Sequence, residues 1–157
     1  MADVHSPSIR SKNMRAIRNQ NTAIEKMLSR LLDEAGITYR TQIADLPGKP
    51  DFVLDEYKAV IFVHGCFWHR HDCYLFRIPS TRTEFWLKKI DSNVKRDNKV
   101  TVLLTEQGWR ELVIWECAMK GRLKLSANAL LERIEEWLCA SNHHAYIDTK
   151  GIHHLNR

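Results

Sequence analysis

Residues 51–63 read DFVLDEYKAVIFV, two apolar runs separated by the polar group Asp55–Lys58. This pattern is typical of a β-hairpin, in which polar residues form the turn between two strands. Residues 61–63 offer no polar position, so the second strand is expected to be buried on both faces. The segment therefore predicts the central part of a sheet that other elements cover on both sides.

The residues before the hairpin indicate a helix, a strand and a loop. Asn21 or Thr22 can cap a helix that runs to Ala35, with Gly36 just beyond its end. The apolar stripe expected on this helix consists of Ile24, Met27, Leu28, Leu31 and Leu32. Residues 37–43 alternate like a strand, and the two prolines and the glycine of 46–50 predict a loop.

The residues after the hairpin indicate helix, strand and helix. Residues 64–82 look irregular, and 83–107 have helical character, with a bend or break expected at 98–101. Residues 109–115 form an apolar strand, and Ser126 can cap a last helix that ends at Cys139. The side chains expected to face the core from that helix are Leu130, Leu131, Ile134 and Trp137.

This order of elements predicts an α/β fold with a mixed central sheet flanked by helices. The 157 residues contain no repeat or linker, so a single domain over 1–157 is expected. Residues 1–20 are interpreted as a basic arm and 141–157 as a polar tail without a predicted element. With neither a membrane-length apolar run nor a signal-peptide pattern, we expect a soluble cytoplasmic protein.

Charge distribution is more informative than the formal net charge of +5. One basic cluster consists of Arg10, Lys12, Arg15 and Arg18, and another of Lys88, Lys89, Lys95, Arg96 and Lys99. Lys89, Asn93 and Arg96 share one helix face and could reach a DNA groove or phosphates. A polyanionic partner and ordinary solvated helix faces both explain these clusters.

Metal-binding side chains are concentrated after the hairpin, because Cys66, His69, His71 and Cys73 lie within eight residues. Four cysteines in an intracellular chain favour a metal or buried thiols over disulfides. A structural zinc with four ligands fits either the local four or Cys66, His71 and Cys73 completed by Cys117. Cys139, on the last helix, is expected to be a buried thiol.

A second group suggests hydrolytic chemistry. Asp51 opens a core strand, and a hairpin brings the end of the next strand, Val63 and His64, close to it. A carboxylate together with the Val63 backbone carbonyl would suit Mg²⁺. His64 and His69 are candidate bases. Two further acids could assist, Glu25 if its helix packs over Asp51 and Asp97 if it orients a histidine.

These residues resemble the very-short-patch-repair (Vsr) mismatch endonucleases of bacteria. The resemblance covers residues 9 to about 139 and rests on Pro50–Val53, Val63–His69, His71, Cys73, Ser11–Ile17, Arg82–Trp86, Asn93 with Asp97, and Trp115–Cys117. It implies a fold related to type II restriction endonucleases and a double-stranded DNA substrate. The implied activity is a nick 5′ of the T of a T·G mismatch in a CTWGG-like context, which starts very short patch repair of deaminated 5-methylcytosine. A monomer is expected, with other mismatch-repair proteins as candidate partners.

The resemblance also implies a role for each residue. Asp51 would bind one or two Mg²⁺ ions together with the carbonyl of Val63, which replaces a threonine frequent in the family. His69 would be the general base paired with Asp97, assisted by His64 and Glu25. The implied zinc ligands are Cys66, His71, Cys73 and Cys117. The implied DNA-intercalating side chains are Phe67, Trp68, Trp86 and Met14, with Lys89, Asn93 and Arg15 as further DNA contacts.

Three alternatives remain at this stage. The first is a non-catalytic zinc-containing DNA-binding module, and the second is a zinc-stabilised nuclease with its histidines in a ββα hairpin. The third is a restriction-like nuclease without mismatch specificity. For the aromatic residues, core packing competes with DNA contact. Because Phe67 and Trp68 are adjacent in an irregular loop, at least one of the two rings is expected to be exposed.

Overall fold

The computed structural model describes residues 23–155, which form a mixed α/β fold around a five-stranded sheet. Its strands follow the chain in spatial order: β1 (Phe52–Leu54), β2 (Ala59–His64), β3 (Arg110–Trp115), β4 (His144–Asp148) and β5 (Gly151–Leu155). The outer pairs β1–β2 and β4–β5 are antiparallel, whereas β2–β3 and β3–β4 are parallel. The predicted mixed sheet with flanking helices is therefore confirmed.

Parallel neighbours require crossover connections, and helices supply them. Helix α2 (Thr83–Glu106) joins β2 to β3, and α3 (Glu116–Met119) with α4 (Ala127–Ala140) joins β3 to β4. The Ser126 hydroxyl caps α4 as predicted, accepting a hydrogen bond from the Ala129 N–H at 3.1 Å. Each crossover thus returns the chain to the end of the sheet where the preceding strand began, so that the next strand runs parallel to it.

The hairpin predicted from residues 51–63 is confirmed. Phe52 pairs with Ile61, and the short helix η1 (Asp55–Tyr57) forms the turn. All six residues of β2 are buried, since β2 lies between β1 and β3 and helices cover both faces of the sheet. The β1 start and the β2 end consequently meet at one place, which is where the candidate site lies.

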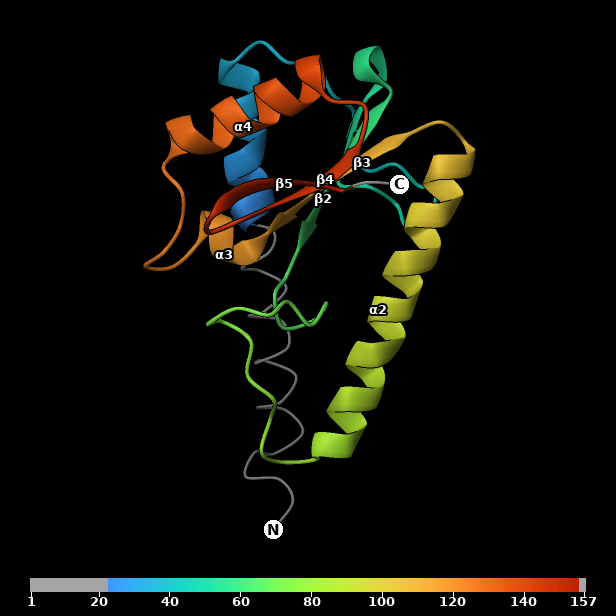
Figure 1. Ribbon diagram of the computed structural model, residues 1–157, viewed down its shortest axis with the longest axis vertical. Helices are drawn as coiled ribbons and strands as arrows, with labels where there is room; N and C mark the ends of the chain where they lie inside the picture. The colour runs from blue at the N-terminus through green and yellow to red at the C-terminus, as the bar shows by residue number, and fades with distance from the viewer. Residues whose placement is uncertain (1–22, 156–157) are drawn as a thin grey trace.

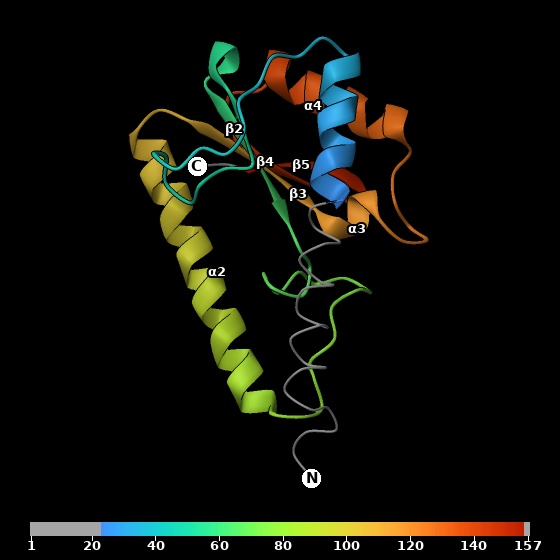
Figure 2. The ribbon, with the colours of Figure 1, turned by 180° about the vertical axis from the view of Figure 1, so that it is seen from behind.

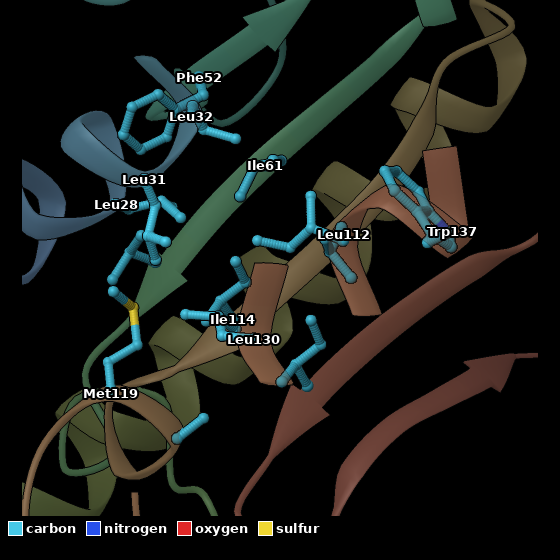
Figure 3. Close-up of a cluster of buried hydrophobic side chains, with 14 of the residues drawn as sticks. Leu28, Leu31, Leu32, Phe52, Ile61, Leu112, Ile114, Met119, Leu130 and Trp137 are labelled. Atoms are coloured by element: carbon cyan, nitrogen blue, oxygen red, sulfur yellow. The ribbon is translucent and has the colours of Figure 1, made fainter. Parts of the chain in front are cut away.

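The larger core fills one face of the sheet. It joins Leu28, Leu31 and Leu32 from the helical residues 23–34 to Leu130 and Trp137 of α4, across Ile61, Leu112 and Ile114 of the central strands (Figure 3). On the other face, Val53, Val60 and Phe62 pack with Leu104 of α2. The two cores bury both faces of the sheet, which explains why β2 carries no polar position before His64.

Helix α2 is longer than the sheet it covers. Its N-terminal half projects beyond the strands, and the irregular segment 65–82 lies alongside it (Figures 1 and 2). Ring contacts between Trp86 of α2 and both Phe67 and Trp68 hold the segment there. Over residues 23–155, the structure contains no helix both long and apolar enough for a membrane span.

Four sequence predictions are wrong in detail. Residues 37–43 form only one isolated bridge, between Arg40 and Val53, instead of a strand. Helix α2 continues without a break through 98–101. Met27 is 41% exposed, because it lies at the margin of the apolar stripe, and Cys139 is exposed on the solvent side of α4.

The polar tail contains structure that its sequence pattern did not predict. Residues 144–155 form β4 and β5, and β4 pairs in parallel with β3 from Leu112↔Ala145 to Ile114↔Ile147. Ala145 and Ile147 are buried in the larger core. The strand reads as polar because its alternate positions, Tyr146 and Asp148, are only half-buried.

Arg110 links three separate parts of the fold. Its guanidinium donates hydrogen bonds to the carbonyls of Trp137, Leu138 and Ser141 at the end of α4, and to that of Tyr57 in η1. The same group lies 4.6 Å from the ring centroid of Trp137. The guanidinium thereby supplies donors to carbonyls at the C-terminus of α4, where a positive charge is also favoured by the helix dipole.

Replacing Arg110 by lysine is expected to lower the free energy of unfolding by about 2 kcal/mol, because a compact ammonium cannot reproduce the planar array of donors. Urea denaturation followed by circular dichroism measures the change. Arg30→Lys on an exposed position of the first helix is the matched control and should leave the midpoint unchanged. Equal midpoints for the two variants would show that the four-carbonyl network does not stabilise the fold.

Candidate active site and metal cluster

Asp51 lies directly before β1, at the point where β1 starts and β2 ends. The Val63 N–H donates a hydrogen bond to Asp51 Oδ2 at 2.7 Å. Burial, together with a hydrogen bond and like charge from Glu25, raises the pKa of Asp51 to about 8, which the Val63 N–H partly opposes. The helix that carries Glu25 does therefore pack over Asp51, and the two acids interact directly.

His69 and Asp97 form a pair beside this carboxyl. His69 Nδ1 lies 2.5 Å from Asp97 Oδ2, and the ring of His64 stacks on that of His69 at 3.8 Å. Burial, with a smaller contribution from His69, holds the pKa of His64 well below its ordinary value. These three side chains could also hold a metal ion. The hydrogen bond to Asp97 occupies His69 Nδ1 and leaves Nε2 available for proton transfer.

A cavity of about 240 Å³ brings the separate groups together. Its lining includes Asp51, Val63, His64, His69 and Asp97. These residues come from the start of β1, the end of β2, the following irregular segment and the middle of α2. Five of the predicted site residues thus converge on one place, and Glu25 contacts this group through Asp51.

The same cavity has three charged lining residues that the sequence interpretation did not assign to the site: Lys49, Arg96 and Glu111. Lys49 belongs to the loop before Asp51, and its positive φ of 51° is unusual for a residue other than glycine. Arg96 was noted only as a member of a basic helix face. Spacing along the chain does not predict that a strand residue such as Glu111 lines this cavity.

A cluster of three thiols and one imidazole lies next to the site. The ligand atoms of Cys66, His71, Cys73 and Cys117 all lie within 4.8 Å of one another, and His71 Nδ1 is 3.5 Å from the Sγ atoms of Cys66 and Cys117. Ligands at about 2.0–2.3 Å from a tetrahedral zinc lie roughly 3.5–3.8 Å apart. The donor set and its spacing therefore fit a zinc ion.

The thiols of the cluster interact strongly with one another. Hydrogen bonding to Cys117 and burial raise the pKa of Cys66, whereas the Cys66 hydrogen bond and His71 lower the pKa of Cys117. The cluster is also anchored from outside, because the Cys66 N–H donates to Glu116 Oε1 at 3.1 Å and the Trp115 ring stacks on His71 at 4.2 Å. A bound cation would allow several thiolates to form side by side.

The predicted DNA-contacting aromatic residues form a half-buried cluster. Phe67 and Trp68 meet edge to face at 5.0 Å, and both contact Trp86. Asn93 donates to the carbonyl of Trp68 at 3.1 Å, so this side chain holds the loop in place. Lys89 is exposed and lies 5.9 Å from the Trp68 ring. Met14 and Arg15, with the whole basic arm, lie outside the described residues.

Glu111 is a buried acid on β3, and its Oε1 accepts a hydrogen bond from the Thr101 hydroxyl at 2.7 Å. Burial raises its pKa from 4.5 to about 7, opposed by the Thr101 hydrogen bond and assisted by the charge of Asp97. The folded chain therefore binds this proton more tightly than the unfolded chain. Its contribution to stability is complete below about pH 4.5 and is lost as the pH rises through about 7.

Glu111→Gln should remove this pH dependence. At pH 8 the variant is expected to exceed the parent in free energy of unfolding by about 2–3 kcal/mol, whereas the two should agree near pH 4.5. Urea denaturation at both pH values measures the difference. Glu136→Gln, at an exposed position of α4, is the control and should show no such divergence. A gap of equal size at both pH values would contradict the raised pKa.

In this mixed α/β fold, a histidine–aspartate pair and a buried acid converge beside a cluster able to hold a metal. Residues 2–75 match the family model described as DNA mismatch endonuclease Vsr. The DNA mismatch endonuclease Vsr of Escherichia coli K12 is 60% identical over 155 residues, 99% of each chain. The protein therefore belongs to the DNA mismatch endonuclease Vsr family and is a DNA endonuclease.

Two further relatives extend the comparison. The type II nicking enzyme V.XorIIP of Xanthomonas oryzae pv. oryzae is 40% identical over 127 residues, 81% of this chain and 93% of the relative. The type II nicking enzyme V.NmeAIP of Neisseria meningitidis is 40% identical over 122 residues, 78% of this chain and 87% of the relative. The similarity thus extends well beyond the 2–75 match and includes the helix that carries Asp97.

Proposed function

We propose that this endonuclease nicks DNA 5′ of the T of a T·G mismatch in a CTWGG-like context, the first step of very short patch repair of deaminated 5-methylcytosine. The observation that carries the proposal is the cavity where Asp51 meets the His69–Asp97 pair, in a chain 60% identical to a mismatch endonuclease. A single domain related to type II restriction endonucleases, acting as a monomer, is part of the same proposal.

Asp51 and the backbone carbonyl of Val63 would hold one or two Mg²⁺ ions. The donor set is suitable, because Asp51 is a buried carboxyl beside a second acid, Glu25, and therefore holds a proton tightly. A divalent cation can take the place of that proton. When bound, Mg²⁺ would supply charge stabilisation for the phosphate and the leaving oxygen. Glu25 and His64 would hold water molecules around the ion.

The protein's own residues would provide the proton chemistry. His69 would accept a proton from the attacking water at Nε2, while Asp97 holds the Nδ1 proton and stabilises the imidazolium that forms. His64, stacked on His69, would fix the plane of the ring. Lys49 and Arg96, which line the same cavity, would neutralise phosphate charge on the bound strand.

The second metal would be a structural zinc on Cys66, His71, Cys73 and Cys117. Three of these ligands lie in the irregular segment and the fourth lies in α3, so the ion would tie a loop with little core of its own to the end of β3. Because His69 stands in the same loop, the zinc would also help to place the proposed general base.

Phe67, Trp68 and Trp86 would insert beside the mismatch, and Met14 from the basic arm would enter the opposite groove. Lys89, Asn93 and Arg15 would make further DNA contacts. A T·G pair lowers the cost of unstacking, so such aromatic wedges favour mismatched DNA over paired DNA. The projecting half of α2 and the adjoining loop lie beyond the strands of the sheet (Figure 1), and the three rings, which come from these two segments, contact one another.

Trp86→Ala should weaken binding of the mismatched duplex about tenfold, since stacking on one base contributes roughly 1–3 kcal/mol. Binding of the fully paired duplex should change much less, because pairing keeps its bases stacked. Fluorescence anisotropy with both duplexes, in EDTA to prevent cleavage, gives the two dissociation constants. An equal loss for both duplexes would argue that Trp86 serves loop packing alone.

The activity is tested with two end-labelled duplexes that differ only by one T·G mismatch in CTWGG. Nicking of the T strand of the mismatched duplex, dependent on Mg²⁺ and abolished by EDTA, supports the proposal. Cleavage of both duplexes would leave an endonuclease without mismatch specificity. Binding without cleavage would indicate a non-catalytic DNA-binding module.

A further inference from the structure

A hydrogen-bonded chain connects Glu111 to the middle of α2. The Thr101 Oγ1 atom lies 2.7 Å from Glu111 Oε1 and 3.1 Å from the carbonyl oxygen of Asp97. Thr101 follows Asp97 by one helical turn, so its hydroxyl lies between the strand acid and the residue that pairs with His69. Glu111 lines the same cavity as these two residues.

A second set of hydrogen bonds holds the backbone of Glu111. Its backbone N–H donates to His144 Nδ1 at 2.9 Å, and His144 Nε2 lies 2.7 Å from the Thr105 hydroxyl. Because Nδ1 accepts a hydrogen bond, a neutral His144 carries its proton on Nε2 and donates it to Thr105. Thr105 in turn donates to the carbonyl of Thr101 at 2.7 Å. Strands β3 and β4 therefore hold two successive turns of α2.

A buried carboxyl at this position lowers the stability of the fold relative to an apolar side chain. Burial raises the pKa of Glu111 to about 7, so its ionised form is disfavoured in the fold. An apolar side chain at this β3 position would pack against α2 without that cost. Buried acids with perturbed pKa values that line a functional cavity are candidates for a functional role.

We propose that Glu111 is a positioning residue for the His69–Asp97 pair and acts through Thr101. The inference rests on the proposed role of His69 as general base. Helix α2 projects beyond the sheet, so apolar contacts alone would permit it to rotate or slide slightly. The hydrogen bond from the Thr101 hydroxyl to Glu111 opposes that movement, one helical turn from Asp97. A displacement of about 1 Å at a reacting pair can slow a reaction roughly a hundredfold.

Thr101→Val tests the proposal, because valine keeps the shape and removes the hydroxyl, and Thr101→Ser restores it. We expect Thr101→Val to lower the single-turnover nicking rate at least tenfold with an unchanged Kd for the mismatched duplex. Thr101→Ser should stay within twofold of the parent. Thr38→Val, at an exposed position before β1, is the matched control. Urea denaturation establishes that each variant is folded under assay conditions.

A second readout does not depend on activity. The proton between His69 Nδ1 and Asp97 should give a downfield NMR signal, assigned by its loss in His69→Gln. In Thr101→Val this signal should shift or broaden, whereas in Thr101→Ser and Thr38→Val it should not. The same shift is expected in Glu111→Leu but not in Glu111→Gln, whose amide oxygen still accepts from Thr101.

Each outcome decides the question. A slower reaction with unchanged DNA affinity and an altered imidazole signal supports the positioning role. A parental rate and signal in folded Thr101→Val would overturn it, as would an equal loss in Thr101→Ser. If the parent protein does not nick the mismatched duplex, the proposed function fails, and the NMR comparison alone decides whether Glu111 and Thr101 position the pair.

Discussion

Asp51→Asn is expected to slow nicking of the mismatched duplex about a thousandfold while DNA binding persists. Asparagine keeps the shape and can still accept from the Val63 N–H, but it has no charge for a divalent cation. Losing about 4 kcal/mol of charge stabilisation in the transition state corresponds to roughly that factor. Single-turnover nicking with saturating Mg²⁺ measures the rate, and anisotropy in EDTA measures binding.

A measurement of stability distinguishes a loss of catalysis in Asp51→Asn from a loss of folding. Because burial and Glu25 raise the pKa of Asp51 to about 8, the neutral amide should not reduce the free energy of unfolding at neutral pH. Asp45→Asn, an exposed acid of the preceding loop, is the matched control and should retain the parental rate. Nicking by Asp51→Asn at more than a tenth of the parental rate would remove Asp51 from the proposed site.

Cys117→Ser is expected to abolish binding of the proposed structural zinc and lower the melting temperature by roughly 10 °C or more. Removing one of four ligands opens the cluster, and a few kcal/mol shift the midpoint of a domain of this size by that amount. Nicking should be lost as well, because the loop that carries His69 loses its attachment to α3. Metal content by mass spectrometry and thermal unfolding by circular dichroism give the two readouts.

The chain contains its own control for this experiment. Cys139 is an exposed thiol outside the cluster, so Cys139→Ser should keep the full metal content and the parental melting temperature. His71→Asn should behave like Cys117→Ser, whereas His69→Asn should keep the metal and lose nicking. Retention of one metal ion per chain in Cys117→Ser, with unchanged melting, would exclude the proposed ligand set.

Local sequence patterns predicted much of the fold. The apolar runs of 51–63 predicted the hairpin and its burial, and Ser126 predicted the start of α4. Where the patterns failed, tertiary contacts explain the difference. Residues 37–43 alternate correctly but have only Val53 as a bridge partner, through Arg40. Strands β4 and β5 were missed because their burial arises from pairing with β3 and with each other.

In the candidate site, too, some residues could be predicted from the sequence and others were found only in the structure. Asp51, His64 and the cysteines of 66–73 could be found by residue type and spacing, because short separations along the chain guarantee proximity. Sequence patterns left the zinc ligand set open between His69 and Cys117. The structure brings Cys117 to within 3.5 Å of His71 Nδ1, and pairs His69 with Asp97 instead. Lys49 and Glu111 carry no local signal and were found only through the cavity they line.

The sequence by itself determined the hairpin, the Ser126 cap of α4, and the chemical types of side chain gathered around residues 51–73. These properties depend on neighbouring residues and on the periodicity of burial. Only the tertiary structure decided which distant groups meet: Asp97 with His69, Cys117 with His71, and Glu111 with Thr101. Such contacts depend on the parallel crossovers through α2 and on the strand register, which arise when the whole sheet is buried between its helices.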